Sequence, residues 1–501
     1  MARLIACRAL FDWNFDGTFT DESTRLVRAS GESRFAPPHE AVTAAQGMTD
    51  SCTLELWNEA GRYSPLNASG ALYAWVQSGG AYHVPVRVEI AIDGSTYYRV
   101  FTGVTKIPQE TGRRWNGVPT VEFECRSVDE LLLQRRMSTT QAGMATRFLD
   151  GYNEAQIIDA FLTAAGVTGQ QMDAGLIPIP WSYLDDESVL EEVWAIAAAA
   201  GGRLYADADG VYRYENMAHW LNSPHTTSQQ SYTNADWQQF RALVDDRELY
   251  DSVTVEYAGR QVEGDSVLWQ PDEEVIIPAG GSRTITAQFQ YPSYTTPVVT
   301  WRAHTRGGTD LTASVTLGAT WYAQRAVLTI TNGHATLSAR IAPLTISGRA
   351  IVGGPTAEVT KTAAADGTNG SYFAARATSR NRGLRGNFYI QGRAQADFLA
   401  QFLLDRHERP MLTYELSGAP GNPQRRPGDR ITVNDVSVMS AARDAIVIAL
   451  SWQFGGMRYS QGITAIDAAA LYPYATTSPG YFRIGVNELG ASDPQRGRLF
   501  Y

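Results

Sequence analysis

Short runs of alternating apolar and polar residues dominate the first quarter of the chain. Residues 86–92 place Val or Ile at every second position, which is the period of a half-buried β-strand. Asp93-Gly94 follows as a two-residue hairpin signal, and residues 120–125 alternate again. Several short strands without helices predict a small barrel or sandwich over residues 1–135.

Length and composition describe a protein with cores of its own. The chain has 501 residues, of which 44% are hydrophobic, and this length suits about three or four domains. No apolar run reaches the ~20 residues that a membrane helix needs, and residues 1–7 lack the pattern of a secretory signal. We therefore expect a protein that is made in a cytoplasm and has no membrane segment.

The three cysteines do not indicate a disulfide framework or a zinc site. Cys7, Cys52 and Cys125 all lie in stretches that read as strands, and none belongs to a CxxC motif. We interpret them as small buried hydrophobic residues.

The charge excludes a general nucleic-acid-binding protein. The formal net charge is -10, and no cluster of positive charge offers a surface for phosphates. Of the 42 basic residues, only Lys106 and Lys361 are lysines, and arginine suits ion pairs between subunits. An acidic protein can still surround DNA, because a lumen that repels phosphate does not trap it.

Residues 136–235 predict an α/β domain. An apolar stripe over residues 157–162 predicts a helix that ends at Gly166. Ser188 and Glu191 fit a capping box at the start of a second helix, and Gly201-Gly202 stops that helix. Residues 203–206 and 211–214 then flank Asp209-Gly210 as a hairpin.

The remainder reads as a second, split β region. We assign it to residues 236–264 and 346–465, with one helix around residues 398–403 that must end before Pro410. Residues 265–345 form an insertion, for which an immunoglobulin-like sandwich is expected. The last strand is predicted to finish by Gly456, and residues 466–501 are predicted to form an extended C-terminal arm.

Several motifs together resemble a known family. Leu54–Asn67 runs from a strand through an Asn/Gly turn into Tyr-Ser-Pro-Leu-Asn, with Asp12–Gly17 upstream and the hairpin of residues 86–103 downstream. The helix, double glycine and hairpin of residues 188–214 and the turn Pro427-Gly428-Asp429 follow. This order resembles the tail-tip proteins of tailed bacteriophages, the baseplate-hub or tail-hub family.

The resemblance implies a mainly β fold with a smaller α/β part. Two small hub-type β-barrels, residues 1–135 and the split second region, would form a ring, braced by the α/β domain, with the inserted sandwich facing outward. A homotrimer of such chains would present six similar barrels to a six-fold tail tube.

The resemblance also implies a structural virion protein at the tail tip. It would close the end of the tail tube and open for DNA ejection, with DNA present only in transit. The implied partners are further copies of the chain, a tail-tube or distal tail protein, a tape-measure protein, and a central fibre or other tip protein.

One motif suggests a metal. Asp12, Asn14 and Asp16 stand at alternating positions before Gly17 and match the first half of an EF-hand calcium loop. The twelfth position is Ser23 instead of a bidentate Glu, so a polar turn that caps its own backbone is the alternative. No other cofactor is expected.

We find no catalytic motif. His39-Glu40 lacks the second His of a zinc peptidase, the seven His residues stand singly, and no phosphate-binding loop is present. The carboxylate pairs Asp185-Asp186 and Asp245-Asp246 lie where turns are expected. We expect no enzyme; the alternatives are a tail-associated enzyme that degrades cell wall or capsule, and a carbohydrate-binding β-protein.

Aromatic residues are the candidates for subunit interfaces, because a ring buries large surfaces between chains. Four lie near the Asn/Gly turn and four in the C-terminal arm: Trp57, Tyr63, Tyr73, Trp75, Tyr481, Phe482, Phe500 and Tyr501. In the arm they stand among Pro, Gly and Ser, so we expect the arm to dock on an adjacent subunit or on the next tip protein. The alternative is a disordered terminus.

Overall fold

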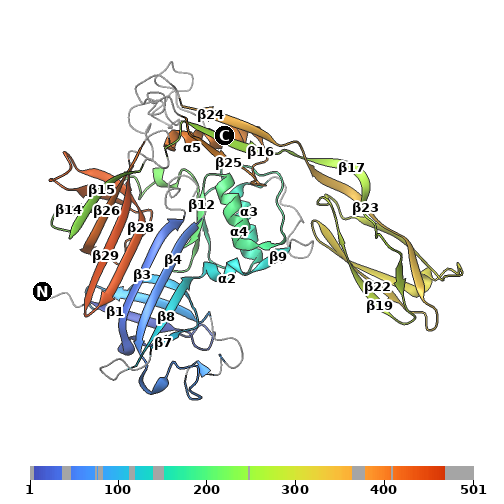
Figure 1. The fold of residues 1–501 in the computed structure, drawn as a ribbon, viewed down its shortest axis with the longest axis horizontal. Helices are drawn as coiled ribbons and strands as arrows, with labels where there is room; N and C mark the ends of the chain where they lie inside the picture. The colour runs from blue at the N-terminus through green and yellow to red at the C-terminus, as the bar shows by residue number, and fades with distance from the viewer. Residues whose placement is uncertain are drawn as a thin grey trace.

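The computed structural model describes residues 5–36, 47–70, 72–73, 76, 83–111, 119–138, 152–245, 249–363, 379–407 and 410–468. In this part the protein is mainly β, as the sequence predicts, with several sheets and a few helices between them (Figure 1).

The N-terminal strands surround a core of their own. The hairpin of residues 86–103 is confirmed, and its turn places Gly94 at a φ of 76°. Cys7, Cys52 and Cys125 are free and buried, as expected. The strands of this group are β1 (Ala6–Phe11), β2 (Thr20–Asp21), β3 (Leu26–Ala36), β4 (Gly47–Trp57), β5 (Pro85–Ala91), β6 (Tyr98–Thr105), β7 (Gln109–Thr111) and β8 (Thr120–Ser127).

The C-terminal strands surround a second core, which contains Tyr232, Tyr414 and Ile463. The predicted strand after Pro427-Gly428-Asp429 is confirmed. The strands of this group are β14 (Gln230–Thr233), β15 (Gln239–Asp245), β26 (Met411–Pro420), β27 (Arg430–Asn434), β28 (Arg443–Gly455) and β29 (Arg458–Asp467).

The two groups are not separate barrels. They join edge to edge in one sheet of 14 strands, in which β3 pairs antiparallel with β28. The path of this sheet runs from β15 to β2 and does not close among the described residues. The expectation of two closed barrels is therefore corrected to two strand groups that share a sheet.

One tryptophan side chain stabilises the joint between the two strand groups, which is the pairing of β3 with β28. Trp452 on β28 lies opposite Gly31 on β3, and its side chain is buried in the N-terminal core although it comes from the C-terminal group. A Cβ at position 31 would lie 2.6 Å from the indole ring, which is closer than packed carbon atoms approach. Gly31 is thus needed so that the ring of Trp452 can lie over β3.

The final strand differs from the sequence prediction. The chain turns at Gly456-Met457 and forms β29, which pairs with both β28 and β26. The prediction that the last strand finishes by Gly456 is therefore wrong. In β29, the inward-facing position 461 holds Gln, whose side-chain amide forms hydrogen bonds with Asn422 and Tyr459 inside the protein. The polar residue interrupts the apolar alternation by which a strand is recognised in the sequence.

The helices pack together in a third core. Both predicted helices of the α/β part are present, Ser188 caps the second of them, and the predicted hairpin around Asp209-Gly210 forms. The lone third helix and the sheet beside it pack into the same core. The elements are α2 (Asp129–Leu133), β9 (Arg136–Ser138), α3 (Glu154–Ala164), β10 (Gln171–Met172), β11 (Asp185–Ser188), α4 (Val189–Ala199), β12 (Arg203–Ala206), β13 (Tyr212–Glu215), β16 (Ser252–Tyr257), β24 (Ala357–Thr362), β25 (Asn381–Leu384) and α5 (Arg393–His407).

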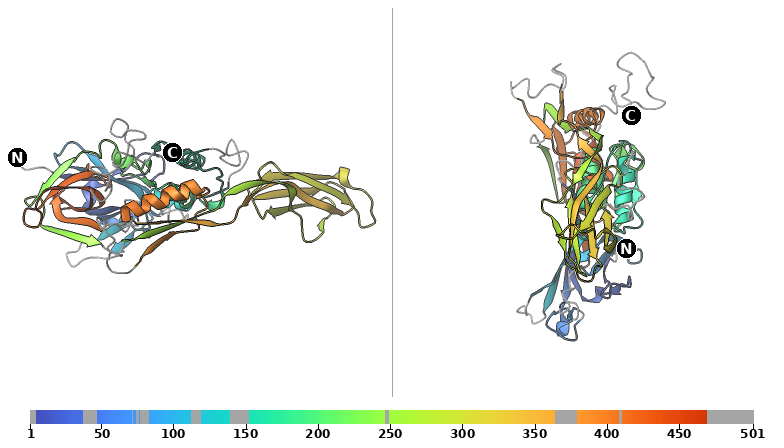
Figure 2. Two further views of the ribbon diagram at one scale, coloured as in Figure 1. Left: turned by 90° about the horizontal axis from the view of Figure 1, so that it is seen from above. Right: turned by 90° about the vertical axis from the view of Figure 1, so that its right-hand side faces the viewer.

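The insertion projects from the body on two long strands (Figures 1 and 2). Its two sheets, β17–β23–β18 with β20, and β19–β22–β21, enclose one core. The strands are β17 (Arg260–Trp269), β18 (Val275–Ile277), β19 (Ser282–Gln288), β20 (Val298–His304), β21 (Val315–Trp321), β22 (Arg325–Asn332) and β23 (Ala339–Gly353).

Side chains also hold the insertion against the body. Arg325 forms an ion pair with Asp185 (3.5 Å) and donates to Ser138 Oγ (2.8 Å). Trp181 and Tyr294 pack edge to face with ring centres 5.5 Å apart. The orientation of the insertion therefore does not depend on the two connecting strands alone.

The packing of Trp452 leads to a stability prediction. We expect Trp452→Ala to lower the free energy of unfolding by about 3–5 kcal/mol, because it removes a large buried side chain from the N-terminal core. Gln453→Ala, on the exposed face of the same strand, is the matched control and should change the free energy by less than about 0.5 kcal/mol. Urea denaturation measures both; equal effects of the two substitutions would contradict the role assigned to Trp452.

Candidate functional site

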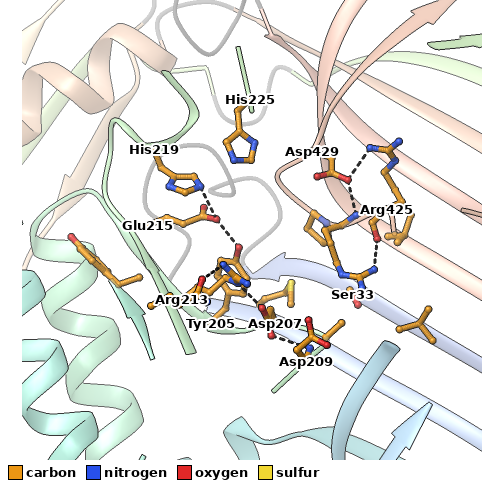
Figure 3. Close-up of a pocket in the computed structure, with 18 of the residues that line it drawn as sticks. Ser33, Tyr205, Asp207, Asp209, Arg213, Glu215, His219, His225, Arg425 and Asp429 are labelled. Atoms are coloured by element: carbon orange, nitrogen blue, oxygen red, sulfur yellow. Dashed lines mark hydrogen bonds and ion pairs between the residues drawn. The ribbon is translucent and has the colours of Figure 1, made fainter. Parts of the chain in front are cut away.

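A polar cavity of about 450 Å³ lies where three parts of the fold meet (Figure 3). One wall comes from strands β3, β4 and β6, one from β10, β12, β13 and the segment after them, and one from the Pro427 turn with β28 and β29. The charged and histidine side chains of the lining are Asp173, Asp207, Asp209, Arg213, Glu215, His219, His225, Arg425, Arg426 and Asp429.

Asp207 organises the floor of the cavity. Its Oδ1 accepts from the backbone N–H groups of Asp209 and Val211 (2.9 and 3.0 Å), so it shapes the turn between β12 and β13. Its Oδ2 accepts from Arg213 Nε (2.5 Å), and Arg213 also donates to Gln171. One carboxylate therefore fixes both the hairpin and the arginine beside it.

Glu215 and His219 connect the next layer. Tyr205 donates its hydroxyl to Glu215 Oε1 (2.6 Å), and Arg203 lies 3.3 Å from Glu215 Oε2. His219 bridges Asp173 (2.7 Å from Nδ1) and Glu215 (3.3 Å from Nε2). Burial alone would lower the pKa of His219, but the hydrogen bond to Asp173 and the charges of Glu215 and Asp173 outweigh burial and raise the pKa.

His225 links this layer to the C-terminal strand group. Its ring lies 4.8 Å from that of His219, and its Nδ1 lies 2.8 Å from the carbonyl oxygen of Gly428. Because a carbonyl only accepts, Nδ1 carries the hydrogen. Burial, followed by the charge of His219, lowers the pKa of His225.

The Pro427-Gly428-Asp429 turn closes the third wall. Asp429 Oδ2 accepts from Arg425 Nη1 (2.8 Å) and from the backbone N–H of Arg426 (2.9 Å). Arg426 Nη2 reaches across to the carbonyl oxygen of Arg99 on β6 (2.6 Å). The turn that the sequence singled out therefore contacts the N-terminal strands directly.

The carboxylates of the cavity are engaged. Asp173 bonds His219, Asp207 bonds Arg213, Glu215 bonds Tyr205, Asp429 bonds Arg425, and Asp209 lies 3.7 Å from Arg99. Across the described ranges, no group of three or more His, Cys, Asp or Glu side chains is placed to hold a metal ion. The arrangement supports a junction that keeps three parts of the fold in a fixed orientation.

Two buried carboxyl groups lie beside this junction. Asp50 on β4 accepts from Ser33 Oγ (2.9 Å) and Asp129 accepts from Ser127 Oγ (3.1 Å). Burial raises the pKa of Asp50 to about 8, with a further contribution from the charge of Asp129, and burial raises the pKa of Asp129 to about 6. Burial therefore favours the protonated form of Asp50.

The face of the large sheet that points away from the two cores is polar, and most of its side chains are small. A groove of about 480 Å³ crosses β4, β3, β28, β29 and β26 on this face. The arginines on β3 and β15 are paired with glutamates: Arg28 with Glu55, Arg34 with Glu32, and Arg241 with Glu415. The side chains of the groove include Ser30, Glu32, Ser51, Thr53, Ser417, Ser451, Gln453 and Ser460.

The structure explains the Asn/Gly turn without a ligand. Asn58 Oδ1 accepts from the backbone N–H of Tyr63 (2.9 Å), and Asn67 donates to the carbonyl oxygens of Ala60 and Gly61. Tyr63 and Arg62 both donate to Glu22, which is almost fully buried. Burial alone would raise the pKa of Glu22, but the bonds from Arg62 and Tyr63 lower it.

The aromatic residues predicted to lie at subunit interfaces differ in their burial. Tyr63 is fully buried in the N-terminal core, so its side chain serves the interior of this chain and is not available to a partner. Trp57 and Tyr73 are half-buried. Trp75 and the four aromatics of the arm lie outside the described residues.

The candidate calcium residues lie together in one turn. Asp12 accepts from the backbone N–H groups of Asp16 and Gly17 (3.2 and 2.9 Å), and Asp16 accepts from that of Thr18 (2.8 Å). These bonds are those of a self-capping turn. Calcium binding by Asp12, Asn14 and Asp16 and the plain turn remain alternatives, and these bonds favour the plain turn.

Sequence reasoning did not group the residues of the cavity. Asp173, the pair His219 and His225, and Asp429 come from three separate segments, and periodicity carries no information on contacts between them. The local signals were the Asp209-Gly210 hairpin and the Pro427-Gly428-Asp429 turn, which the sequence located without a role. The pair Asp185-Asp186 proves to be divided between Arg325 and Arg136.

Comparisons with known proteins find similarity in structure only. No protein-family model matches the chain, and a search of curated proteins finds no match. No helix in the described ranges has the length and apolar character to cross a membrane.

Three solved structures resemble the fold. The tail protein from Neisseria meningitidis MC58 has a TM-score of 0.49 and 11% identity, covering 93% of this chain and 97% of that one. The 43 kDa tail protein of prophage MuSo2 from Shewanella oneidensis has a TM-score of 0.47 and 11% identity, covering 93% and 99%. A component of the type VI secretion system of E. coli has a TM-score of 0.38 and 8% identity, covering 89% and 75%.

The raised pKa of Asp50 leads to a pH prediction. The folded state keeps a proton that an unfolded Asp loses near pH 4, so the free energy of unfolding should fall as the pH rises from about 4 to about 8. Asp50 contributes at most about 1.4 kcal/mol per pH unit to this slope. Asp50→Asn should remove that part, because an amide keeps the bond from Ser33 without a charge. Asp209→Asn controls for loss of a carboxylate, and an unchanged slope in Asp50→Asn would contradict the assignment. Urea unfolding between pH 5 and pH 9 is the measurement.

A double substitution tests the turn at Asp12. Since both Asp12 oxygens already accept backbone N–H groups, we expect Asp12→Ala with Asp16→Ala to lower the melting temperature equally with added calcium and with a chelator. A loss that appears only in calcium would establish a metal site there. Thermal unfolding of both proteins under the two conditions decides between these outcomes.

Proposed function

We propose that this chain is a structural protein of a phage tail tip: a homotrimeric hub that closes the end of the tail tube and opens for DNA ejection. The observation that carries the proposal is the fused sheet. Two strand groups with separate cores stand side by side in one chain, joined by β3 and β28. Three such chains would supply six units to a six-fold tube.

The polar face of the sheet supports a channel lining. Its side chains are short, so they leave room for a passing molecule, and the arginines on β3 and β15 are paired with glutamates. Phosphate binding depends on available Lys or Arg. Arg126, opposite Ser51, and Arg458 are exposed on this face as well, so the lining would offer few cations to DNA as it passes.

The remaining parts have roles in this proposal. The hydrogen bonds and ion pairs around the cavity would hold the α/β part against both strand groups, so that the ring keeps its shape. The insertion, which projects from the body in Figure 2, would face outward. The partners would be a tail-tube or distal tail protein, a tape-measure protein, and a central fibre or other tip protein, and the protein would reside in the virion.

Charge on the polar face provides the test. We expect Ser51→Arg with Ser451→Arg to leave particle assembly intact and to slow triggered DNA release, because the added cations bind phosphate; higher salt should restore the rate. Thr316→Arg, at an exposed site of the insertion, is the matched control and should release DNA normally.

Release kinetics of purified particles, followed with a DNA dye, measure this effect. Normal release from the Ser51/Ser451 variant at low salt would contradict a channel lined by this face. Particles that lack the protein and still have closed tail tips would contradict the hub itself.

A further inference from the structure

Strand β15 is an unprotected edge of the large sheet. It pairs with β26 along all seven residues without a shift in register, and no strand pairs with its other side in the described part of the chain. Leu243 and Val244 are 41% and 61% exposed. The strand thus presents free backbone groups and apolar side chains together.

Other free edges of this sheet are short and polar. β2 has two residues, Thr20 and Asp21, β7 has three, and β14 has four with Gln, Ser and Thr among them. Proteins usually block edges by shortness, proline, bulges or charge. β15 has no proline and no bulge. Its Arg241 is paired with Glu415 and its Asp245 stands at the end of the strand, so residues 242–244 lack the features that usually block an edge.

The core side of β15 is open at this edge. Phe240, Ala242 and Val244 lie opposite Leu416, Tyr414 and Leu412 of β26, so they share the face that covers the C-terminal core. Phe240 packs on that core beside Tyr414, whereas Ala242 and Val244 remain exposed. A further strand with apolar residues at every second position would complete this face.

The sequence of this chain contains a segment with this pattern. Residues 481–487 read Tyr-Phe-Arg-Ile-Gly-Val-Asn, with Phe482, Ile484 and Val486 at every second position. Placed antiparallel with Ile484 opposite Ala242, the segment sets Phe482 against Val244 and Val486 against Phe240. The three apolar pairs then fall on one face, and the polar residues fall on the other.

We propose that residues 481–487 of one copy add as an antiparallel strand to β15 of the adjacent copy. The proposal rests on the proposed function in one respect, which is that several copies assemble. A contact between two different surfaces, repeated head to tail, can close a ring of three, whereas pairing of β15 with itself would give a two-fold dimer.

The end of the described chain lies close to this edge. β29 and β15 both run antiparallel to β26, so they end at the same end of the sheet. They are two strand spacings apart, about 10 Å. Fully extended, residues 469–480 span up to about 40 Å, so residues 481–487 are not confined to the β15 edge of their own chain and can extend to that of another copy.

Engineered cysteines test the pairing. Leu243→Cys with Arg483→Cys places two thiols on one face of the proposed pair, and mild oxidation by a disulfide reagent should link chains into species up to the trimer on a non-reducing gel. The native cysteines are buried. Leu243→Cys with Ile484→Cys is the control, since these side chains would point to opposite faces, and it should link at least tenfold less.

The pattern of cross-links decides whether the strand pairs within one chain or between chains. A disulfide within one chain, or no inter-chain link in either purified protein or assembled particles, would overturn the proposal. Open polymers in place of trimers would keep the pairing and contradict the ring of three.

A single substitution gives an independent measurement. Val244 is exposed, so a lysine at this position can point into solvent without disturbing the fold. Val244→Lys should weaken self-association at least tenfold, because a charge on the edge blocks strand addition. Val436→Lys, at a residue that is 75% exposed in the loop after β27, is the matched control and should associate as the wild type does. Sedimentation equilibrium measures both, and a trimer of unchanged affinity in Val244→Lys would contradict the docking site while leaving the hub proposal standing.

Discussion

The contact between Trp452 and Gly31 decides how the rest of the molecule is organised. A large side chain from the C-terminal strand group fills the core of the N-terminal group, and only a glycine on β3 leaves room for it. The pairing of β3 with β28 is thereby fixed in register, and two strand groups become one sheet. The joint places the polar faces of the two groups side by side in one continuous sheet.

The side chains around the polar cavity also connect the two strand groups. His225 reaches the Gly428 carbonyl of the C-terminal group, Arg426 reaches the Arg99 carbonyl of the N-terminal group, and Asp207 holds the hairpin between them. Such a network is stable only when its members are satisfied, because an unpaired buried charge is costly. In the proposed ring, a junction of this kind would keep the three parts of each chain in a fixed orientation.

Local structure could be predicted from the sequence, and contacts between distant segments could not. The β5–β6 hairpin, helices α3, α4 and α5, and the β12–β13 hairpin were predicted because their periodicity and turn residues lie within about ten residues. β29 was missed because Gln461 occupies an inward position and is satisfied by Asn422 from another segment. The role of Glu22 was also missed, because its partners Arg62 and Tyr63 lie far along the chain.

The same limit applies to function. The motifs of Leu54–Asn67 and of the Pro427 turn indicated a tail-tip protein by their order, and their geometry now has a physical explanation in hydrogen bonds of Asn58, Asn67 and Asp429. The joining of the two strand groups through Trp452 was not visible in any local pattern, because it depends on a pairing of residues more than four hundred positions apart.

A cryo-electron microscopy reconstruction of the tail tip tests the central claim most directly. The account predicts three copies of this chain in a closed ring, with Ser51, Ser451 and Ser460 facing the channel and the insertion on the outside. A single copy, or a ring in which this face of the sheet is turned away from the channel, would contradict it.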